Sequence, residues 1–248
     1  MKVSERWLHS LSLVGFFALW QVVAQVLENP TLPAPTAVLA ALWHQLVAGE
    51  LLFHLGVTLW RVTVAFAVSM LIGTSVGVLM GRYRAADSAL DGLLILSLNI
   101  PALVTIILCY VWFGLVEAAA IAAVAINKIP TVIVTVREGA RAVDRKLLEV
   151  ADAFRIPRRR KLLRVYLPQL YPYLMAAARS GLALIWKIVL VVELLGRSNG
   201  VGFQLATYFQ FFDITNILAY TFAFAAIVLF VEAAVMRPID NRISRWRT

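Results

Sequence analysis

Long apolar stretches of this 248-residue sequence contain the ionisable side chains of Lys128, Arg179, Lys187 and Glu193. Charged groups in such surroundings are costly, and they usually face a water-filled cavity or an oppositely charged partner. Lys128 and Lys187 lie deep in their stretches, and positive groups there suit an anionic solute. The chemistry that these residues predict is therefore electrostatic binding of an anion along a path through the protein.

The same residues also have structural interpretations. The two lysines can be buried in packing or paired with Glu117 or Glu193. Arg179 lies about two turns from the end of its stretch, so its long side chain can reach the membrane surface. Glu193 and Arg197 are four residues apart and can pair on one helix face.

Two prolines add to this candidate path. Pro101 and Pro130 break helical hydrogen bonds inside apolar stretches. Such breaks are tolerated where neighbouring groups or a cavity satisfy the freed carbonyls. Each proline either marks a solute path or is an ordinary feature of a membrane helix.

Catalytic and metal-binding residue types are too few and too scattered to form a site. His44 and His54 are ten residues apart, with Glu50 as their only nearby carboxylate. Cys109 is the single cysteine, so it can form neither an internal disulfide nor a metal site alone. We therefore predict that the chain is not an enzyme and holds no metal.

The composition predicts that membrane helices position these residues. Apolar residues make up 61% of the sequence, against roughly 45–50% in soluble domains, and the mean hydropathy is +0.82. Residues 37–52 are typical of a short amphipathic helix at the membrane surface. Six apolar segments are long enough to span a bilayer core of roughly 30 Å: 11–28, 56–80, 88–113, 115–136, 173–196 and 216–236. We expect an all-α, polytopic membrane protein with a single domain over residues 1–248.

The basic residues predict its orientation. The net charge is +9, but the charges cluster between apolar runs, which argues against nucleic-acid binding. Placing the N-terminus inside puts eighteen of the twenty-three Lys and Arg residues in cytoplasmic segments, including Arg242, Arg245 and Arg247. The positive-inside rule then predicts cytoplasmic termini and a cytoplasmic loop at about 137–172.

Small residues line one face of the second apolar segment. Ser69, Gly73, Gly77 and Gly81 recur every four residues. This spacing lets the backbone of a neighbouring helix come close. The neighbour is either another helix of the same chain or a second subunit.

The cytoplasmic loop contains a patterned segment at 149–168. Leu147, Val150, Ala151 and Phe154 recur as one apolar face of a helix, and a second helix is expected after Pro157. Basic residues of the second helix can face phospholipid headgroups or an acidic partner. The amphipathic pattern alone leaves two interpretations open: a helix pair anchored on lipid, or a surface that another protein binds.

The spacing within this segment resembles the EAA motif of the permease subunits of ABC importers. In that motif Glu-Ala-Ala is followed after three residues by Gly, and after nine more by Ile-x-Leu-Pro. The matching residues are Glu149, Ala151, Leu167 and Pro168, and the departures are Val150, Arg155 and Val165. By this resemblance the ATPase-coupling residues are Glu149, Val150, Ala151, Asp152, Ala153, Phe154, Arg155, Pro157, Leu167 and Pro168.

Further motifs resemble the nitrate, sulfonate, taurine and bicarbonate branch of these permeases. They are Leu32-Pro33-Ala34-Pro35, Gly73 to Gly81, Ile100-Pro101, Trp112-Phe113-Gly114, Val192-Glu193 and Gly200-Val201-Gly202, in the expected order. The resemblance covers nearly the whole chain and implies a type I importer permease of the bacterial inner membrane. It also implies an anionic solute, which agrees with the candidate path that the residues themselves suggest at Lys128, Lys187, Pro101 and Glu193.

The resemblance implies the partners as well. In such importers a short helix of the loop sits in a groove of a cytoplasmic ATP-binding subunit, and an external binding protein delivers the solute. Two permease copies assemble with two ATPases. The sequence has no GxxxxGK[ST] loop, so ATP and Mg²⁺ are expected to bind to the partner and not to this chain.

The sequence leaves alternatives open for the turn after the first loop helix and for the function. Arg155 stands where the motif has Gly, so either the turn differs or Pro157 makes the bend. An ion-coupled secondary transporter is the alternative function. Six segments are few for its common inverted-repeat designs, and no acidic residue lies convincingly at mid-membrane to bind a coupling ion.

Overall fold

The computed structural model describes residues 2–238, and these residues form helices without any strand. The predicted all-α class is therefore confirmed, while Arg242, Arg245 and Arg247 lie outside the described residues. The helices are α1 Lys2–Leu27, α2 Pro35–Val47, α3 Leu51–Arg82, α4 Arg84–Asn99, α5 Ala102–Phe113, α6 Glu117–Arg141, α7 Arg145–Ala153, α8 Arg158–Lys161, the π-helix η1 Leu162–Tyr166, α9 Leu167–Gly196, α10 Val201–Gln210, α11 Ile214–Val231 and the π-helix η2 Glu232–Met236.

Four continuous helical stretches in the described part are long and apolar enough to cross a membrane. They are Leu51–Arg82, Glu117–Arg141, Arg158–Gly196 and Ile214–Met236. The broken pair of α4 and α5 can add a fifth span, and the apolar part of α1 is shorter, at Leu11–Leu27. The expected number of six spans stays a prediction.

The expected span at 88–113 is broken at Pro101, as the sequence predicts, and α4 and α5 meet there at a bend of 99°. Ile100, the residue before Pro101, is extended with ψ of 124°, as proline steric effects favour. Pro130 differs, since α6 continues through it from Glu117 to Arg141. The first surface helix also differs from expectation: α2 begins earlier, with Pro35 in its first turn, and it ends at Val47.

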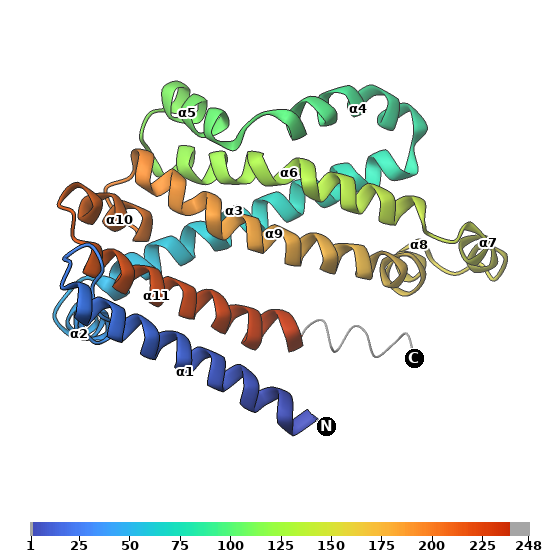
Figure 1. Ribbon diagram of the computed structural model, residues 1–248. Helices are drawn as coiled ribbons and strands as arrows, with labels where there is room; N and C mark the ends of the chain where they lie inside the picture. Colours follow the sequence, from blue (N-terminus) through green and yellow to red (C-terminus); the bar gives the residue numbers. More distant parts are fainter. Residues whose placement is uncertain (1, 239–248) are drawn as a thin grey trace.

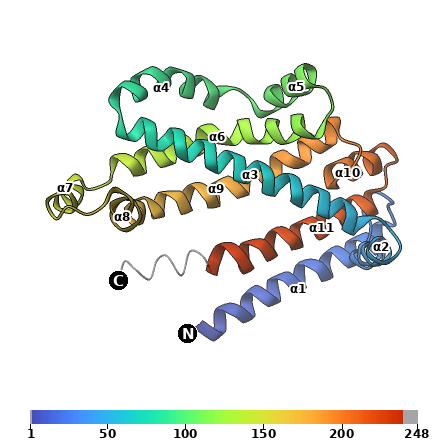
Figure 2. The same cartoon turned by 180° about the vertical axis from the view of Figure 1, so that it is seen from behind.

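The centre of the molecule is the packing of α3, α6 and α9, which lie side by side in both views (Figures 1 and 2). Added Cβ atoms at Gly73, Gly77 and Gly81 would lie 2.5–2.9 Å from atoms of α6. The atoms met are the Cβ atoms of Val132, Val136 and Ala140. Fully buried Ser69 belongs to the same face. The stripe of small residues therefore packs α3 against α6 within one chain.

The long helices give the molecule two distinct ends (Figure 1). We call them the α7 end, which carries α7 and α8, and the α10 end, which carries α2, α5 and α10. α1 begins and η2 ends on the α7 side of the molecule (Figure 2). This agrees with the prediction that the termini and the 137–172 loop share one side of the membrane; that this side is the cytoplasm stays a prediction.

Candidate functional site

The segment at 145–161 contains one separate short helix, α7, as the sequence predicts. The predicted second short helix is wrong, because α8 continues through η1 into α9 as one stretch, Arg158–Gly196. Asp144 caps α7 by accepting a hydrogen bond from the Lys146 backbone N–H at 2.8 Å. After α7, the Arg155 N–H donates to the Asp152 carbonyl and the Ile156 N–H donates to the Ala151 carbonyl, both at 2.9 Å. These two bonds form a Schellman motif, which places its pivotal residue in the left-handed region.

That pivotal residue is Arg155, with φ of +52°. Both alternatives from the sequence are therefore wrong: the turn has the geometry for which glycine is suited, and Arg155 itself adopts it. Pro157 follows with φ of −54° and precedes α8. A non-glycine residue in this conformation costs about 1–2 kcal/mol, so the turn is strained.

The apolar face of α7 is largely uncovered. Leu147, Val150 and Phe154 are 49%, 51% and 78% exposed, and only Ala151 is buried against the rest of the chain. α7 stands beyond the ends of the long helices (Figure 1). A patch of this kind on a projecting helix is typical of an interaction surface.

The other residues of the coupling set surround that face. Glu149, Asp152 and Ala153 are exposed, and Asp152 forms an ion pair with Lys161 of α8 at 2.5 Å. Leu167 and Pro168 open α9, directly after η1. The set therefore extends from the projecting helix to the first turn of a long membrane helix.

At the α10 end, the expected pair of Glu193 and Arg197 is not formed. Glu193 is fully buried, and its carboxylate accepts from Arg61 Nη1 at 2.8 Å. Arg197 instead pairs with Glu117 at 2.8 Å. The prediction was wrong because it considered one helix, whereas the partners come from α3 and α6.

Arg61 connects this network. It is 1% exposed, and its Nε donates to Glu117 Oε1 at 2.7 Å. It also bonds to both the backbone and the side chain of Asn199. No site role was predicted for Arg61, although an arginine at the edge of the expected 56–80 segment was a usable signal.

The network holds the beginning of α10. The Gly200 N–H donates to His54 Nδ1, the Val201 N–H to Thr58 Oγ1, and the Gly202 N–H to Glu193 Oε2, at 2.9–3.0 Å. These N–H groups open a helix and have no acceptor within it. Gly200 has φ of +105°, and a Cβ there would overlap the Glu193 carboxylate. A Cβ at Gly202 would overlap the Leu190 carbonyl oxygen, so this turn requires both glycines.

Lys128 is the buried charge that remains without a counterion. It lies midway along α6, is 1% exposed, and forms no hydrogen bond or ion pair with any residue in 2–238. Gly181 of α9 makes room for it, since a Cβ there would lie 2.7 Å from Lys128 Cε. The suggested partners Glu117 and Glu193 are both bound to Arg61.

The other predicted path residues lie apart from Lys128. Lys187 is exposed on α9, and Pro101 is exposed at the bend between α4 and α5. Arg179 is 46% exposed and lies 3.6 Å from Glu232 of η2, and its predicted snorkelling stays a prediction. In the described range no group of three His, Cys, Asp or Glu side chains could hold a metal ion.

Residues 70–245 match the model of a known family, the binding-protein-dependent transport system inner membrane component. The chain belongs to this family. It is the transmembrane permease subunit of an ABC importer in the bacterial inner membrane, and not an enzyme. The family implies an ATP-binding subunit and a solute-binding protein as partners, and it favours this function over a secondary transporter.

Individual relatives agree with this assignment. The chain is 28% identical over 244 residues to the putative aliphatic sulfonates transport permease protein SsuC of Bacillus subtilis, covering 97% of the permease and 88% of the relative. It is 30% identical to SsuC of Escherichia coli, covering 77% and 73%. It is 26% identical to the taurine transport system permease protein TauC of Escherichia coli, covering 95% and 88%.

Proposed function

We propose that this permease carries a small organic anion of the sulfonate type, and that Lys128 attracts the anion along its path. The observation that carries the proposal is that Lys128 is buried at mid-helix and pairs with no described residue. An uncompensated ammonium group is costly in such a place, so a transient anionic partner would offset that cost. The names of the sulfonate and taurine relatives support the same solute class.

We also propose that the ATP-binding subunit contacts the uncovered apolar face of α7. Leu147, Val150 and Phe154 offer apolar area that a groove in an ATP-binding subunit can bury. In this arrangement ATP binding changes the position of α7, and α9 transmits the change because η1 joins α8 to it without a break. The α7 end is then the cytoplasmic end, as the basic residues predict. ATP and Mg²⁺ belong to the partner subunit.

A second permease copy and membrane lipid complete the proposed assembly. The small-residue stripe of α3 is occupied by α6 within the chain, so the second copy must contact another surface. Lys187 is exposed on α9, and in a homodimer it would face either the partner or the solute path. Pro101 lies at the bend beside a cavity of about 250 Å³ that Ser97, Thr105 and Asn127 line.

The test is ATP-dependent uptake of an aliphatic sulfonate into proteoliposomes that contain the permease, its ATPase and its binding protein. We expect Lys128→Met to lower uptake at least about tenfold, because one lost charge interaction of about 1.5–3 kcal/mol has this effect. The control is Arg160→Met, which removes an exposed positive charge from α8 and should leave uptake at the wild-type level. Unchanged uptake in Lys128→Met, with intact ATP coupling, would overturn the role of Lys128.

A further inference from the structure

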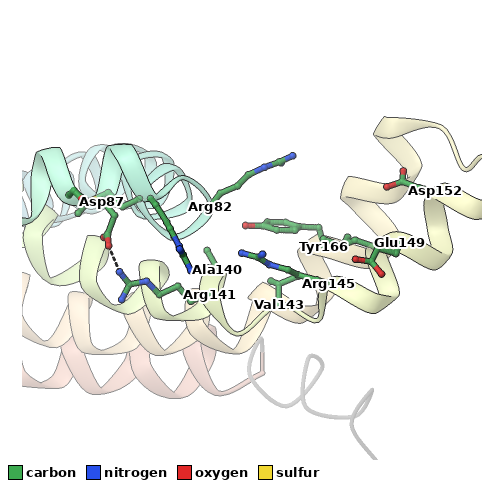
Figure 3. A pocket seen from close by; sticks show the side chains of 14 residues that line it. Arg82, Asp87, Ala140, Arg141, Val143, Arg145, Glu149, Asp152 and Tyr166 are labelled. Atoms are coloured by element: carbon green, nitrogen blue, oxygen red, sulfur yellow. Dashed lines mark hydrogen bonds and ion pairs between the residues drawn. The ribbon is translucent and has the colours of Figure 1, made fainter.

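A large polar pocket lies beside α7 (Figure 3). Glu149 and Asp152 of the coupling set line it, whereas Leu147, Val150 and Phe154 do not. It has a volume of about 810 Å³ and is formed by the turn between α3 and α4, the end of α6, α7 and η1. The turn and the end of α6 are the α7-side ends of two membrane helices. The pocket is therefore at the level where lipid headgroups meet the protein.

The charges lining this pocket are not balanced. Arg82, Arg84 and Arg145 form no hydrogen bond or ion pair with the described residues. Two carboxylates of the lining are already engaged, Asp87 by Arg141 and Asp152 by Lys161. Glu149 is the one lining carboxylate in residues 2–238 without such a bond. Three unbonded guanidinium groups against one unbonded carboxylate leave an excess of positive charge.

Tyr166 gives independent evidence for a ligand. The residue is 8% exposed, and its hydroxyl is buried with no hydrogen-bond partner among residues 2–238. Figure 3 shows the hydroxyl directed toward the α3–α4 turn, with the Arg145 side chain extending beside it in the same direction. A buried hydroxyl without a partner costs about 1–3 kcal/mol, and an acceptor in the pocket would satisfy it.

We propose that this pocket binds a phosphate group, held by Arg82, Arg84 and Arg145 and by a hydrogen bond from Tyr166. Guanidinium groups bind phosphate oxygens through paired N–H donors, and the hydroxyl supplies one more donor. The phosphate belongs either to the headgroup of an anionic phospholipid or to a free phosphate ion. The location at the helix ends suits a headgroup.

A bound phosphate would also affect how α7 transmits movement of the ATPase, an inference that rests on the proposed contact between α7 and the ATPase. Arg145 belongs to α7, whereas Arg82 and Arg84 belong to the α3–α4 turn. A bound phosphate would therefore connect α7 to the membrane helices. Occupancy of the pocket would hold α7 in place while the ATPase contacts the face of α7 that carries Leu147, Val150 and Phe154.

Native mass spectrometry of the full-length permease tests the binding. We expect the purified protein to retain one phosphatidylglycerol in preference to phosphatidylcholine. The variant Arg82→Gln/Arg84→Gln/Arg145→Gln should lower retention at least about tenfold, and Tyr166→Phe several-fold. The matched control is Arg158→Gln/Arg159→Gln/Arg160→Gln, which removes the same charge from exposed α8 and should retain lipid as the wild type does.

Titration of inorganic phosphate into the permease in a neutral detergent separates the two sources. Binding of phosphate without lipid retention, lost in the pocket variant, assigns the site to a soluble ion. Equal losses in the pocket variant and the α8 control would reduce the effect to general surface charge and overturn the proposal. So would the absence of both ligands from the wild type.

The ratio of ATPase activities in phosphatidylglycerol and phosphatidylcholine nanodiscs tests the link to coupling in the assembled transporter. We expect this ratio to exceed one for the wild type and to fall toward one for Tyr166→Phe. Lipid retention without any such change would leave the binding site intact and remove its regulatory role. Failure of the uptake test on Lys128 affects neither result.

Discussion

The two ends of this permease differ in whether their charged side chains are bonded within the chain. At the α10 end, Arg61 and Glu193 are buried and every charged group of the network bonds to another part of the chain. At the α7 end, Arg82, Arg84 and Arg145 are exposed and form no hydrogen bond or ion pair with the described residues, and the apolar face of α7 is uncovered. The first end is completed within the chain, whereas the second requires other molecules. Substitutions at the α10 end should therefore alter stability, and those at the α7 end should alter coupling.

The largest effect is expected at Arg61. Arg61→Met leaves Glu193 buried without its cation, and removal of one partner from a buried pair costs about 3–5 kcal/mol. Thermal unfolding of the purified permease, followed by tryptophan fluorescence, measures the loss. Arg160→Met on exposed α8 is the control and should unfold as the wild type does. An unchanged midpoint for Arg61→Met would remove the contrast between the ends.

Gly200→Ala should have the next largest effect, about 2–4 kcal/mol. The new Cβ meets the Glu193 carboxylate, and an L-residue is strained at φ of +105°. Gly114→Ala is a matched control, because Gly114 also has a positive φ of +78° but open space around its Cβ. Unfolding midpoints of the two variants separate the overlap from the backbone strain. Equal losses would show that the network does not confine the α10 turn.

At the α7 end, Phe154→Ser should leave the free energy of unfolding within about 0.5 kcal/mol, since the side chain is 78% exposed. ATP-driven uptake should nevertheless fall at least about tenfold, because loss of an apolar anchor costs about 2 kcal/mol or more of binding. Co-purification of the ATPase with the permease checks the cause. A variant that unfolds early but still binds the ATPase would show that α7 serves the fold.

The smallest effect is expected at Arg155, and its sign is reversed. Arg155→Gly should stabilise the permease by about 1 kcal/mol, because glycine adopts φ of +52° without the steric cost. Arg155→Ala keeps that cost and is the control. The unfolding midpoints of both variants and their ATPase rates are the measurements. Equal midpoints for the two would show that the turn is not strained.

Features set by local spacing could be predicted from the sequence. The recurrence of Leu147, Val150, Ala151 and Phe154 predicted α7 and its apolar face, and the length of the apolar runs predicted the long helices. Both depend on neighbours within a few turns. The small-residue stripe predicted a close helix contact, but the identity of its partner needed the structure.

Features set by distant contacts could not be predicted. Glu193 has Arg197 four residues away, yet it bonds to Arg61, 132 residues earlier in the chain. Pro101 and Pro130 have the same local chemistry, but α4 ends before Pro101 and α5 begins after it, whereas α6 continues through Pro130. Arg155 shows the reverse case, in which the turn geometry persists although the residue suited to it is absent.

The unbroken helix from α8 through η1 into α9 restricts insertions and deletions in this segment. Each residue added to or removed from a continuous helix rotates everything beyond it by about 100°. Since η1 joins α8 to α9 without interruption, a single-residue insertion or deletion at 158–166 would turn the basic face of α8 about the axis of α9. Length variation in this segment should therefore be rare among functional relatives, whereas the connection at 28–34 should accept it.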